Sequence, residues 1–224
     1  MALQKLARRI PLWSVYAALL LALALAFLYV PPEATMGNAY RIMFYHIGSA
    51  WNALLAFSVT FAASIAYLRR DDPNWDRLAF ASAEVGVFFT SVTLISGSIW
   101  GRAVWLTWWT WEPRLTTTLL LWFIYVFYLL LRSSADGDAA RMRLSAVVAV
   151  VGFIDEPIVY LSVFWWKGLH PETVQLDARM AIALAVSVAA FTLFYLYLLG
   201  RRLTLESLSE RVQDLKERYR RELA

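Results

Sequence analysis

The sequence contains no cysteine and only two histidines among its 224 residues. The absence of cysteine excludes disulfides, cysteine-ligated zinc and iron–sulfur clusters held by this chain. Charged residues are also scarce, at 17 % of the chain. Together with 60 % hydrophobic residues and a mean hydropathy of +0.54, this scarcity indicates a membrane protein with several spans rather than a soluble domain.

Six apolar stretches are each long enough to cross about 30 Å of hydrocarbon as a helix. Helices are expected because a backbone in lipid must satisfy its polar groups within its own segment, and the stretches lack the alternation of a membrane barrel. We therefore predict an all-α, polytopic membrane protein with a bundle of six transmembrane helices, the first of them a retained span and not a signal peptide. The predicted spans are residues 13–30, 47–68, 78–99, 115–131, 144–166 and 180–199.

The basic residues predict the orientation of the spans and give no indication of nucleic-acid binding. Most of the 21 Lys and Arg residues lie near the N-terminus, in the loops at 69–77 and 132–143, and after residue 200. The alternate loops contain only Arg41, Arg102, Arg114, Lys167 and Arg179. The positive-inside rule then predicts that both termini are cytoplasmic. The loops at about 31–46, 100–114 and 167–179 are expected on the outer side.

The chain divides into a membrane domain, residues 1–199, and a cytoplasmic amphipathic tail, residues 200–224. Apolar residues recur in the tail at spacings of three and four, with Asp214–Arg218 and Glu217–Arg221 as supporting i,i+4 pairs. They are Leu205, Leu208, Val212, Leu215 and Tyr219. Two heptads are too few for an independent coiled coil, so two interpretations stay open: a basic amphipathic helix on the inner membrane surface and a docking helix for a cytoplasmic partner.

Tryptophan is concentrated in one predicted outer loop, where five of the chain's 11 tryptophans fall within twelve residues. They are Trp100, Trp105, Trp108, Trp109 and Trp111. Tryptophans at a bilayer interface are usually anchors, but this density favours a broad surface for a large planar ligand. If the segment is helical, Trp105, Trp108, Trp109 and Glu112 share one face, which would make an amphipathic plate along the membrane surface.

The two histidines, His46 and His170, are both predicted at the outer ends of spans. A histidine at a membrane boundary is commonly an interfacial hydrogen-bonding group. Two neutral imidazoles beside an aromatic surface, however, suit the two axial positions of a haem iron. Arg41, Arg102, Arg114, Lys167 and Arg179 are candidate partners for the haem propionates.

Acidic residues interrupt two predicted spans. Asp155 and Glu156 precede Pro157 near the middle of the fifth span, and Glu84 lies in the third. Charged groups in a membrane usually face the bundle interior and mark either structural pairing or function. Structurally, they would be protonated or paired with another group. Functionally, they would move protons or help to open the helix at Pro157.

Four segments give the chain a resemblance to a known family. The tryptophan-rich segment resembles the "WWD" signature of the haem-handling proteins of cytochrome c maturation, and its flanking segments resemble the haem exporter protein C (CcmC) family within that superfamily. The family's acidic motif residue is normally Asp, where this chain has Glu112 followed by Pro113. The resemblance covers nearly the whole chain. The segments are NAYRIMFYH (38–46), GSIWG (97–101), WGRAVWLTWWTWEPRLT (100–116) and PIVYLSVFWWKGLH (157–170).

The resemblance implies a haem-delivery protein of the cytoplasmic (inner) membrane rather than an enzyme. It implies that His46 and His170 ligate the iron of haem b, bound non-covalently and transiently at the outer, periplasmic face. The tryptophans would form the haem platform, and Glu112 would contact a partner. The implied partners are a periplasmic haem chaperone, to which haem is presented for c-type cytochrome biogenesis, and the ABC transporter subunits of the Ccm system.

Two other functions stay open from the sequence. A b-type cytochrome subunit with two histidine ligands would carry electrons, although such proteins usually place both histidines within spans. A membrane permease would use polar groups in a broken helix near the bilayer midplane, for which only Asp155, Glu156 and Pro157 in the fifth span are candidates.

Overall fold

The computed structural model describes residues 9–134, 138–166, 168–171 and 175–223. Within these residues the regular elements are helices, apart from one isolated bridge between Glu33 and Gly37. The elements are α2 (Leu12–Ala24), η1 (Leu25–Tyr29), η2 (Asn38–Arg41), α3 (Ile42–Arg70), α4 (Pro73–Trp105), α5 (Pro113–Ser134), α6 (Asp138–Gly152), α7 (Asp155–Trp165) and α8 (Ala178–Leu223).

The prediction of six membrane spans is confirmed, because six helical segments are long and apolar enough to cross a bilayer. Several helices are longer than the predicted spans, since an apolar stretch ends at the first polar residues whereas the helix continues through them. The segments are Leu12–Tyr29, Asn38–Arg70, Pro73–Trp105, Pro113–Arg132, Ala139–Trp165 and Ala178–Ser209. The protein is therefore an all-α, multi-pass membrane protein.

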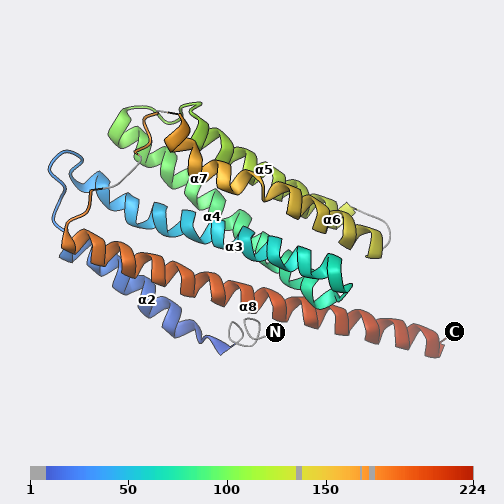
Figure 1. Ribbon diagram of the computed structural model, residues 1–224. Coiled ribbons are helices and arrows are strands. Elements are labelled where there is room, and N and C mark those ends of the chain that lie inside the picture. The colour runs from blue at the N-terminus through green and yellow to red at the C-terminus, as the bar shows by residue number, and fades with distance from the viewer. Residues whose placement is uncertain (1–8, 135–137, 167, 172–174, 224) are drawn as a thin grey trace.

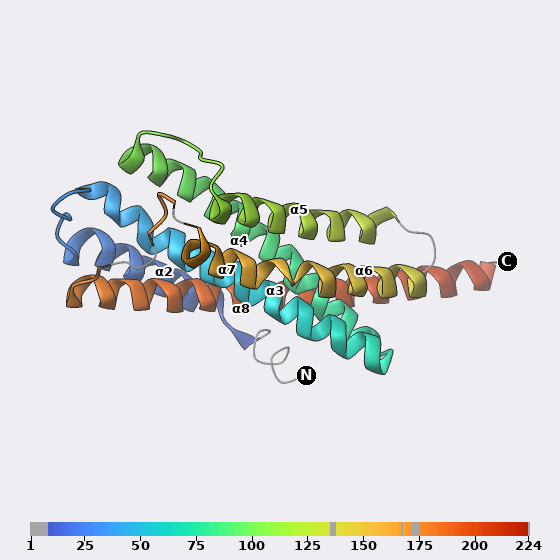
Figure 2. The ribbon, with the colours of Figure 1, turned by 45° about the horizontal axis from the view of Figure 1, so that its top comes forward.

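The α3–α4 hairpin forms the centre of the bundle (Figure 1). Helix α8 packs on the hairpin and carries α2, whereas α5 and α6 also pack on the hairpin and α7 packs on α5 (Figure 2). The hairpin turn is encoded locally. Asp71 ends α3 in the left-handed conformation, and the Asp72 side chain caps α4 by accepting the backbone N–H of Asn74 at 2.9 Å, with Pro73 in the first turn.

Small residues allow α3 and α4 to approach closely, as is common between membrane helices. Ala56 and Ala83 are fully buried in the core, and a Cβ at Gly86 would meet the Phe57 ring at 2.5 Å. The Phe57 ring in turn stacks on Tyr125 of α5, with ring centroids 3.7 Å apart. The core thus joins the central hairpin to α5 through a stack of aromatic rings.

The fifth span is two helices, because the chain leaves the α-helix at Phe153 and Ile154. Pro157 has no N–H to donate to the Phe153 carbonyl, which accepts the N–H of Glu156 instead, at 3.1 Å. The Phe153 ring stacks on Phe61 of α3, with centroids 4.1 Å apart. The single helix predicted over residues 144–166 is therefore wrong at this point.

Helix α8 runs without interruption through the predicted boundary between residues 199 and 200. The predicted apolar stripe of the tail is exposed along it. The two i,i+4 pairs predicted there involve Asp214 and Glu217, whose side chains fall outside the described part of the chain.

One end of the bundle gathers the connections at 30–41, 106–112, 168–171 and 175–177, drawn at the left of Figure 1. The α3–α4 turn and the C-terminal part of α8 lie at the other end. The described parts of the three loops predicted to share one side of the membrane thus share one end of the molecule. His170 lies in one of them, and His46 lies in α3 just after another.

Candidate functional site

His46 lies in the second turn of α3, half-buried against α4. Its Nδ1 is 3.1 Å from the hydroxyl of Ser96 on α4. That hydroxyl donates to the Thr93 carbonyl at 3.2 Å, so its oxygen is left to accept the Nδ1–H of His46. In a neutral ring with Nδ1–H, the lone pair available for a metal is on Nε2.

Gly97 lets α4 pass close to this ring. A Cβ at Gly97 would lie 2.9 Å from Cε1 of His46, closer than a real side chain tolerates. The glycine and Ser96 therefore fix the ring from the side of α4.

His170 lies in the short connection after α7, partly buried. Its Nδ1 is 3.1 Å from the carbonyl oxygen of Pro171. A carbonyl only accepts, so Nδ1 carries the proton and Nε2 is again the free nitrogen. Burial, together with the nearby charge of Arg114, lowers the pKa of His170 to about 4, so the ring is neutral at pH 7 as a metal ligand must be.

Glu112 joins the tryptophan-rich segment to the His170 loop. Its Oε2 accepts the backbone N–H of Leu169 at 2.7 Å and that of His170 at 3.3 Å. Gly168 lies against the same carboxylate, where a side chain would collide with it. Glu112 therefore positions His170, whereas its predicted contact with a partner stays a prediction.

Arg114 is the arginine that the fold brings to both histidines. Its guanidinium lies near His170, and its charge also reaches His46. Arg114, Glu112 and His170 line one small pocket with Ser162 and Trp166, of about 10 Å³, which is room for about one water. A ligand as large as haem would therefore have to lie over the outer surface of this end rather than in this pocket.

The tryptophan-rich segment does not form the helix in which Trp105, Trp108, Trp109 and Glu112 would share one face. Helix α4 ends at Trp105, Leu106 has a φ of 60°, and residues 106–112 are not helical. The helical plate over Trp105–Glu112 does not form, because a left-handed residue ends the helix at one side and Pro113 starts α5 at the other.

The five tryptophans do not form one flat surface. Trp100 is buried and meets Trp105 edge to face, with centroids 5.0 Å apart. Trp109 meets Trp111 edge to face at 5.8 Å, and its Nε1 is buried without a hydrogen-bond partner. Trp108 and Trp111 are 60 % and 76 % exposed, so these two rings are the ones available to a planar ligand.

The other predicted propionate partners have contacts of their own. Arg41 donates to the Val30 carbonyl and lies over the Phe27 ring, Arg102 donates to the Leu106 carbonyl, and Arg179 lies over Tyr29. Lys167 lies outside the described residues. Arg114 is therefore the predicted cation that the structure places beside the histidines.

The intramembrane acids have different surroundings. Glu84 pairs with Arg202 of α8, which is one of the two outcomes that the structural interpretation allowed. Glu156 accepts a hydrogen bond from Ser58 of α3 at 2.9 Å, and its other oxygen is buried without a partner. Asp155 is 8 % exposed and its Oδ2 also has no partner. These two acids remain the only basis for the permease alternative.

Sequence reasoning did not identify Ser96 and Gly168 as members of the site. Both act through contacts with residues far away in the chain, His46 and Glu112 respectively. The only available signal was their place inside or beside two family-like segments, and that signal does not state their role.

A family model described as "Heme exporter protein C" matches residues 1–218. The heme exporter protein C of Bradyrhizobium diazoefficiens is 35 % identical over 218 residues, covering 94 % of this chain and 83 % of that protein. Its namesake from Rhodobacter capsulatus is 31 % identical, covering 90 % and 87 %. That of Escherichia coli K12 is 32 % identical, covering 79 % and 72 %. This chain therefore belongs to the haem exporter protein C (CcmC) family.

Proposed function

We propose that the protein binds haem at the end of the bundle that contains His46 and His170 and passes it to a haem chaperone for c-type cytochrome biogenesis. One observation carries the proposal: both histidines lie at this end, each with Nδ1 beside an oxygen acceptor and Nε2 left for iron. Such second contacts fix the ring and raise its strength as a ligand.

The chemistry of the surrounding residues fits haem. Arg114 lines one pocket with His170 and offers a cation for a propionate there, and the exposed rings of Trp108 and Trp111 offer apolar surface for the porphyrin. Haem is the cargo and brings its own reactive vinyl groups. The protein contributes orientation and access, so we class it as a delivery protein rather than an enzyme.

Handover requires at least one bond between iron and imidazole to break. His170 belongs to a connection held by Glu112, whereas His46 belongs to a long helix.

The proposed partners are a periplasmic haem chaperone at this end and the ABC transporter subunits of the Ccm system. Haem b would be held non-covalently and only until transfer.

The first test is the absorbance spectrum of the purified protein titrated with haem. We expect a low-spin, six-coordinate spectrum that weakens in His46→Ala and in His170→Ala and vanishes in the double variant. Trp108→Ala and Trp111→Ala should weaken binding. The matched control is Trp13→Ala, which removes a ring that is 72 % exposed on α2. Unchanged haem uptake by the double histidine variant would contradict the proposal.

A transfer assay separates delivery from electron transport. A delivery protein loses its haem to the purified chaperone, whereas a b-type cytochrome retains it through repeated redox cycles. The chain has only two histidines, and neither lies in the middle of a span, which disfavours the cytochrome alternative.

The proposed orientation places the histidine end in the periplasm and both termini in the cytoplasm, in keeping with the positive-inside rule. Because the chain lacks cysteine, a single introduced cysteine can be labelled on either side of the membrane without labelling of other thiols in the chain. Ala34→Cys and Ala140→Cys introduce exposed thiols at opposite ends. In intact spheroplasts, a membrane-impermeant maleimide should label the first and spare the second, and the reverse pattern would invert the orientation.

A further inference from the structure

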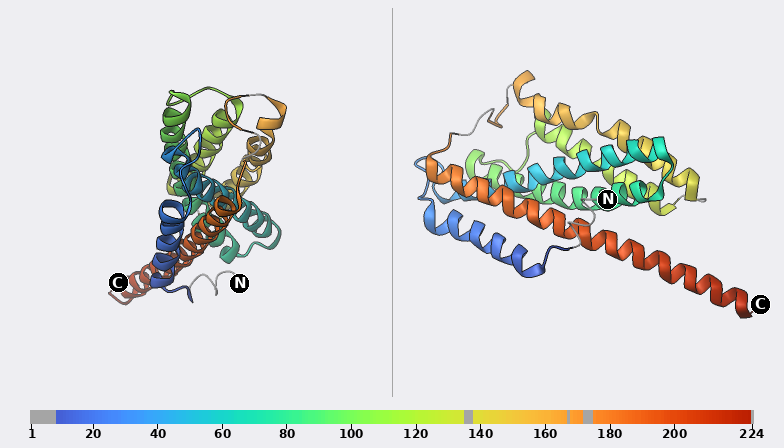
Figure 3. Two further views of the ribbon diagram at one scale, coloured as in Figure 1. Left: turned by 90° about the vertical axis from the view of Figure 1, so that its left-hand side faces the viewer. Right: turned by 60° about the horizontal axis from the view of Figure 1, so that its bottom comes forward.

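Helix α8 is too long and too continuous to end at the membrane. Its 46 residues correspond to about 69 Å at 1.5 Å per residue, more than twice the roughly 30 Å of hydrocarbon. Figure 3 shows it leaving the bundle as one straight helix. A helix that crosses the bilayer and does not bend cannot also lie in the plane of its surface, which disfavours the interpretation as a surface helix.

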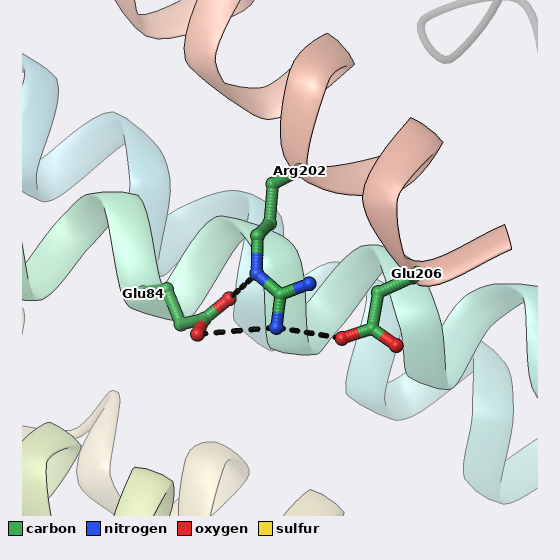
Figure 4. Close-up of polar contacts among 3 residues, drawn as sticks. All are labelled: Glu84, Arg202 and Glu206. Atoms are coloured by element: carbon green, nitrogen blue, oxygen red, sulfur yellow. Dashed lines mark hydrogen bonds and ion pairs between the residues drawn. The ribbon is translucent and has the colours of Figure 1, made fainter. Parts of the chain in front are cut away.

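The direction of this projection is fixed where α8 leaves the other helices. Arg202 pairs with Glu84 of α4 and with Glu206 one turn further along α8, the latter at 2.6 Å (Figure 4). Its guanidinium lies 5.0 Å from the centre of the Phe80 ring, and the neighbouring Leu203 is 3 % exposed. These contacts hold α8 against α4 at the point from which it projects.

An apolar stripe follows the projecting helix, and none of the described residues covers it. Its members are spaced three and four residues apart, which places them at the a and d positions of two heptads. The stripe continues ten residues past the last apolar span, which ends at Ser209. They are Leu205 at 59 %, Leu208 at 50 %, Val212 at 49 %, Leu215 at 64 % and Tyr219 at 63 % exposure.

The residues that border the stripe carry charge of one sign. In this register Arg211 and Arg218 occupy g positions and Lys216 an e position, and all three are exposed. In a parallel pair of two copies, Arg211 would face Lys216 of its neighbour, and an antiparallel pair would also bring basic residues together. Like charges at these positions oppose pairing, so a second copy of the chain is disfavoured as the occupant.

We propose that residues 205–219 pair in a short coiled coil with a helix of another protein, whose apolar seam is bordered by Asp and Glu. The apolar stripe supplies the seam, and the basic border selects the sign of the partner's charge. The partner would lie on the side of the membrane that contains the α3–α4 turn. The proposal does not depend on haem binding.

The test uses the full chain in phosphatidylcholine nanodiscs, with a fluorophore on Arg220→Cys, outside the seam. The probes are two synthetic three-heptad helices with Leu at a and d, one with Glu and one with Lys at e and g. We expect the Glu helix to bind at least about tenfold more tightly than the Lys helix. Reversing Arg211, Lys216 and Arg218 to Glu should invert that preference.

Two further variants separate binding through the apolar seam from non-specific attraction between opposite charges. Val212→Ser with Leu215→Ser should reduce binding of the Glu helix at least about tenfold, while Arg201→Gln, outside the heptads, should leave it unchanged. Equal binding of both helices, or no binding, would overturn the proposal. So would a label that becomes buried in lipid when phosphatidylserine is added, or energy transfer between two labelled copies without peptide.

Discussion

The carboxylate of Glu112 accepts the backbone N–H of Leu169 at 2.7 Å, across 57 residues of sequence. The same oxygen also accepts the N–H of His170. The tryptophan-rich segment and the histidine loop are thereby one unit, although they belong to different connections. A change at residue 112 is therefore expected to act on the haem site through His170.

Glu112→Ala should raise the dissociation constant for haem about tenfold. A hydrogen bond to a charged group contributes about 1.5–3 kcal/mol, and about 1.4 kcal/mol corresponds to a factor of ten. Haem titration followed by absorbance measures the change. Glu112→Gln keeps an oxygen acceptor and should change binding less than about threefold. Thr116→Ala removes only a hydroxyl bonded to the Glu112 carbonyl and should have no effect.

The His170 ligand should survive mild acid. Burial and, to a smaller extent, the charge of Arg114 lower its pKa from 6.5 to about 4. Between these values the unfolded chain binds a proton that the folded chain does not, so the stability contributed by the neutral ring falls as the pH drops through this window. In His46→Ala, where His170 is the remaining histidine, the ligation signal should persist from pH 8 to about pH 5. A midpoint near 6.5 would contradict the buried, neutral ring.

The hydrogen bonds of Glu112 to the His170 loop provide the control for that pH profile. Adding Glu112→Ala to His46→Ala releases the backbone of residues 169 and 170 and exposes the ring. The midpoint of the ligation signal should then move upward, toward 6.5. An identical profile in both variants would show that Glu112 does not keep His170 buried.

The six spans could be predicted from the sequence, but the residues at which their helices begin and end could not. Apolar runs are local, so six spans could be predicted, whereas the extensions of α3 and α4 depend on polar residues that continue a helix. The break at Phe153 was signalled only by Pro157. The helical plate considered for the tryptophan-rich segment does not form because Leu106 adopts a left-handed conformation, which helical spacing cannot reveal.

The two histidines of the site could be predicted from the sequence, but the contacts that orient them could not. The two histidines could be placed at one end from topology alone. The contacts that orient them, Ser96 with His46 and Glu112 with the His170 loop, join residues at least 50 apart in the sequence. Such contacts depend on packing between helices and leave no periodic pattern.

Gly97→Ala should weaken haem binding through His46. The added Cβ would lie 2.9 Å from the imidazole, so the ring must move away from Ser96, and forced repacking of this kind costs about 1–3 kcal/mol. We expect about a tenfold weaker haem affinity and a smaller low-spin signal. Ser98→Ala, one residue further along α4, removes a hydroxyl bonded to its own helix and should behave as the unchanged protein. Equal affinities of the two variants would exclude this effect of Gly97.

Arg202 should matter more to stability than Glu84, because it has two acidic partners. Arg202→Gln leaves Glu84 and Glu206 close together without their shared cation, whereas in Glu84→Gln the arginine retains Glu206. The side chains of Arg202 and Glu84 are only 27 % and 32 % exposed. We therefore expect Arg202→Gln to lower the free energy of unfolding by about 1–2 kcal/mol and Glu84→Gln to lower it by less. Thermal unfolding in nanodiscs, followed by tryptophan fluorescence, measures both. Arg143→Gln removes a pair whose side chains are 66 % and 69 % exposed and should leave the transition unchanged, because solvent screens that pair. A larger loss in Glu84→Gln than in Arg202→Gln would mean that Glu206 does not share the arginine.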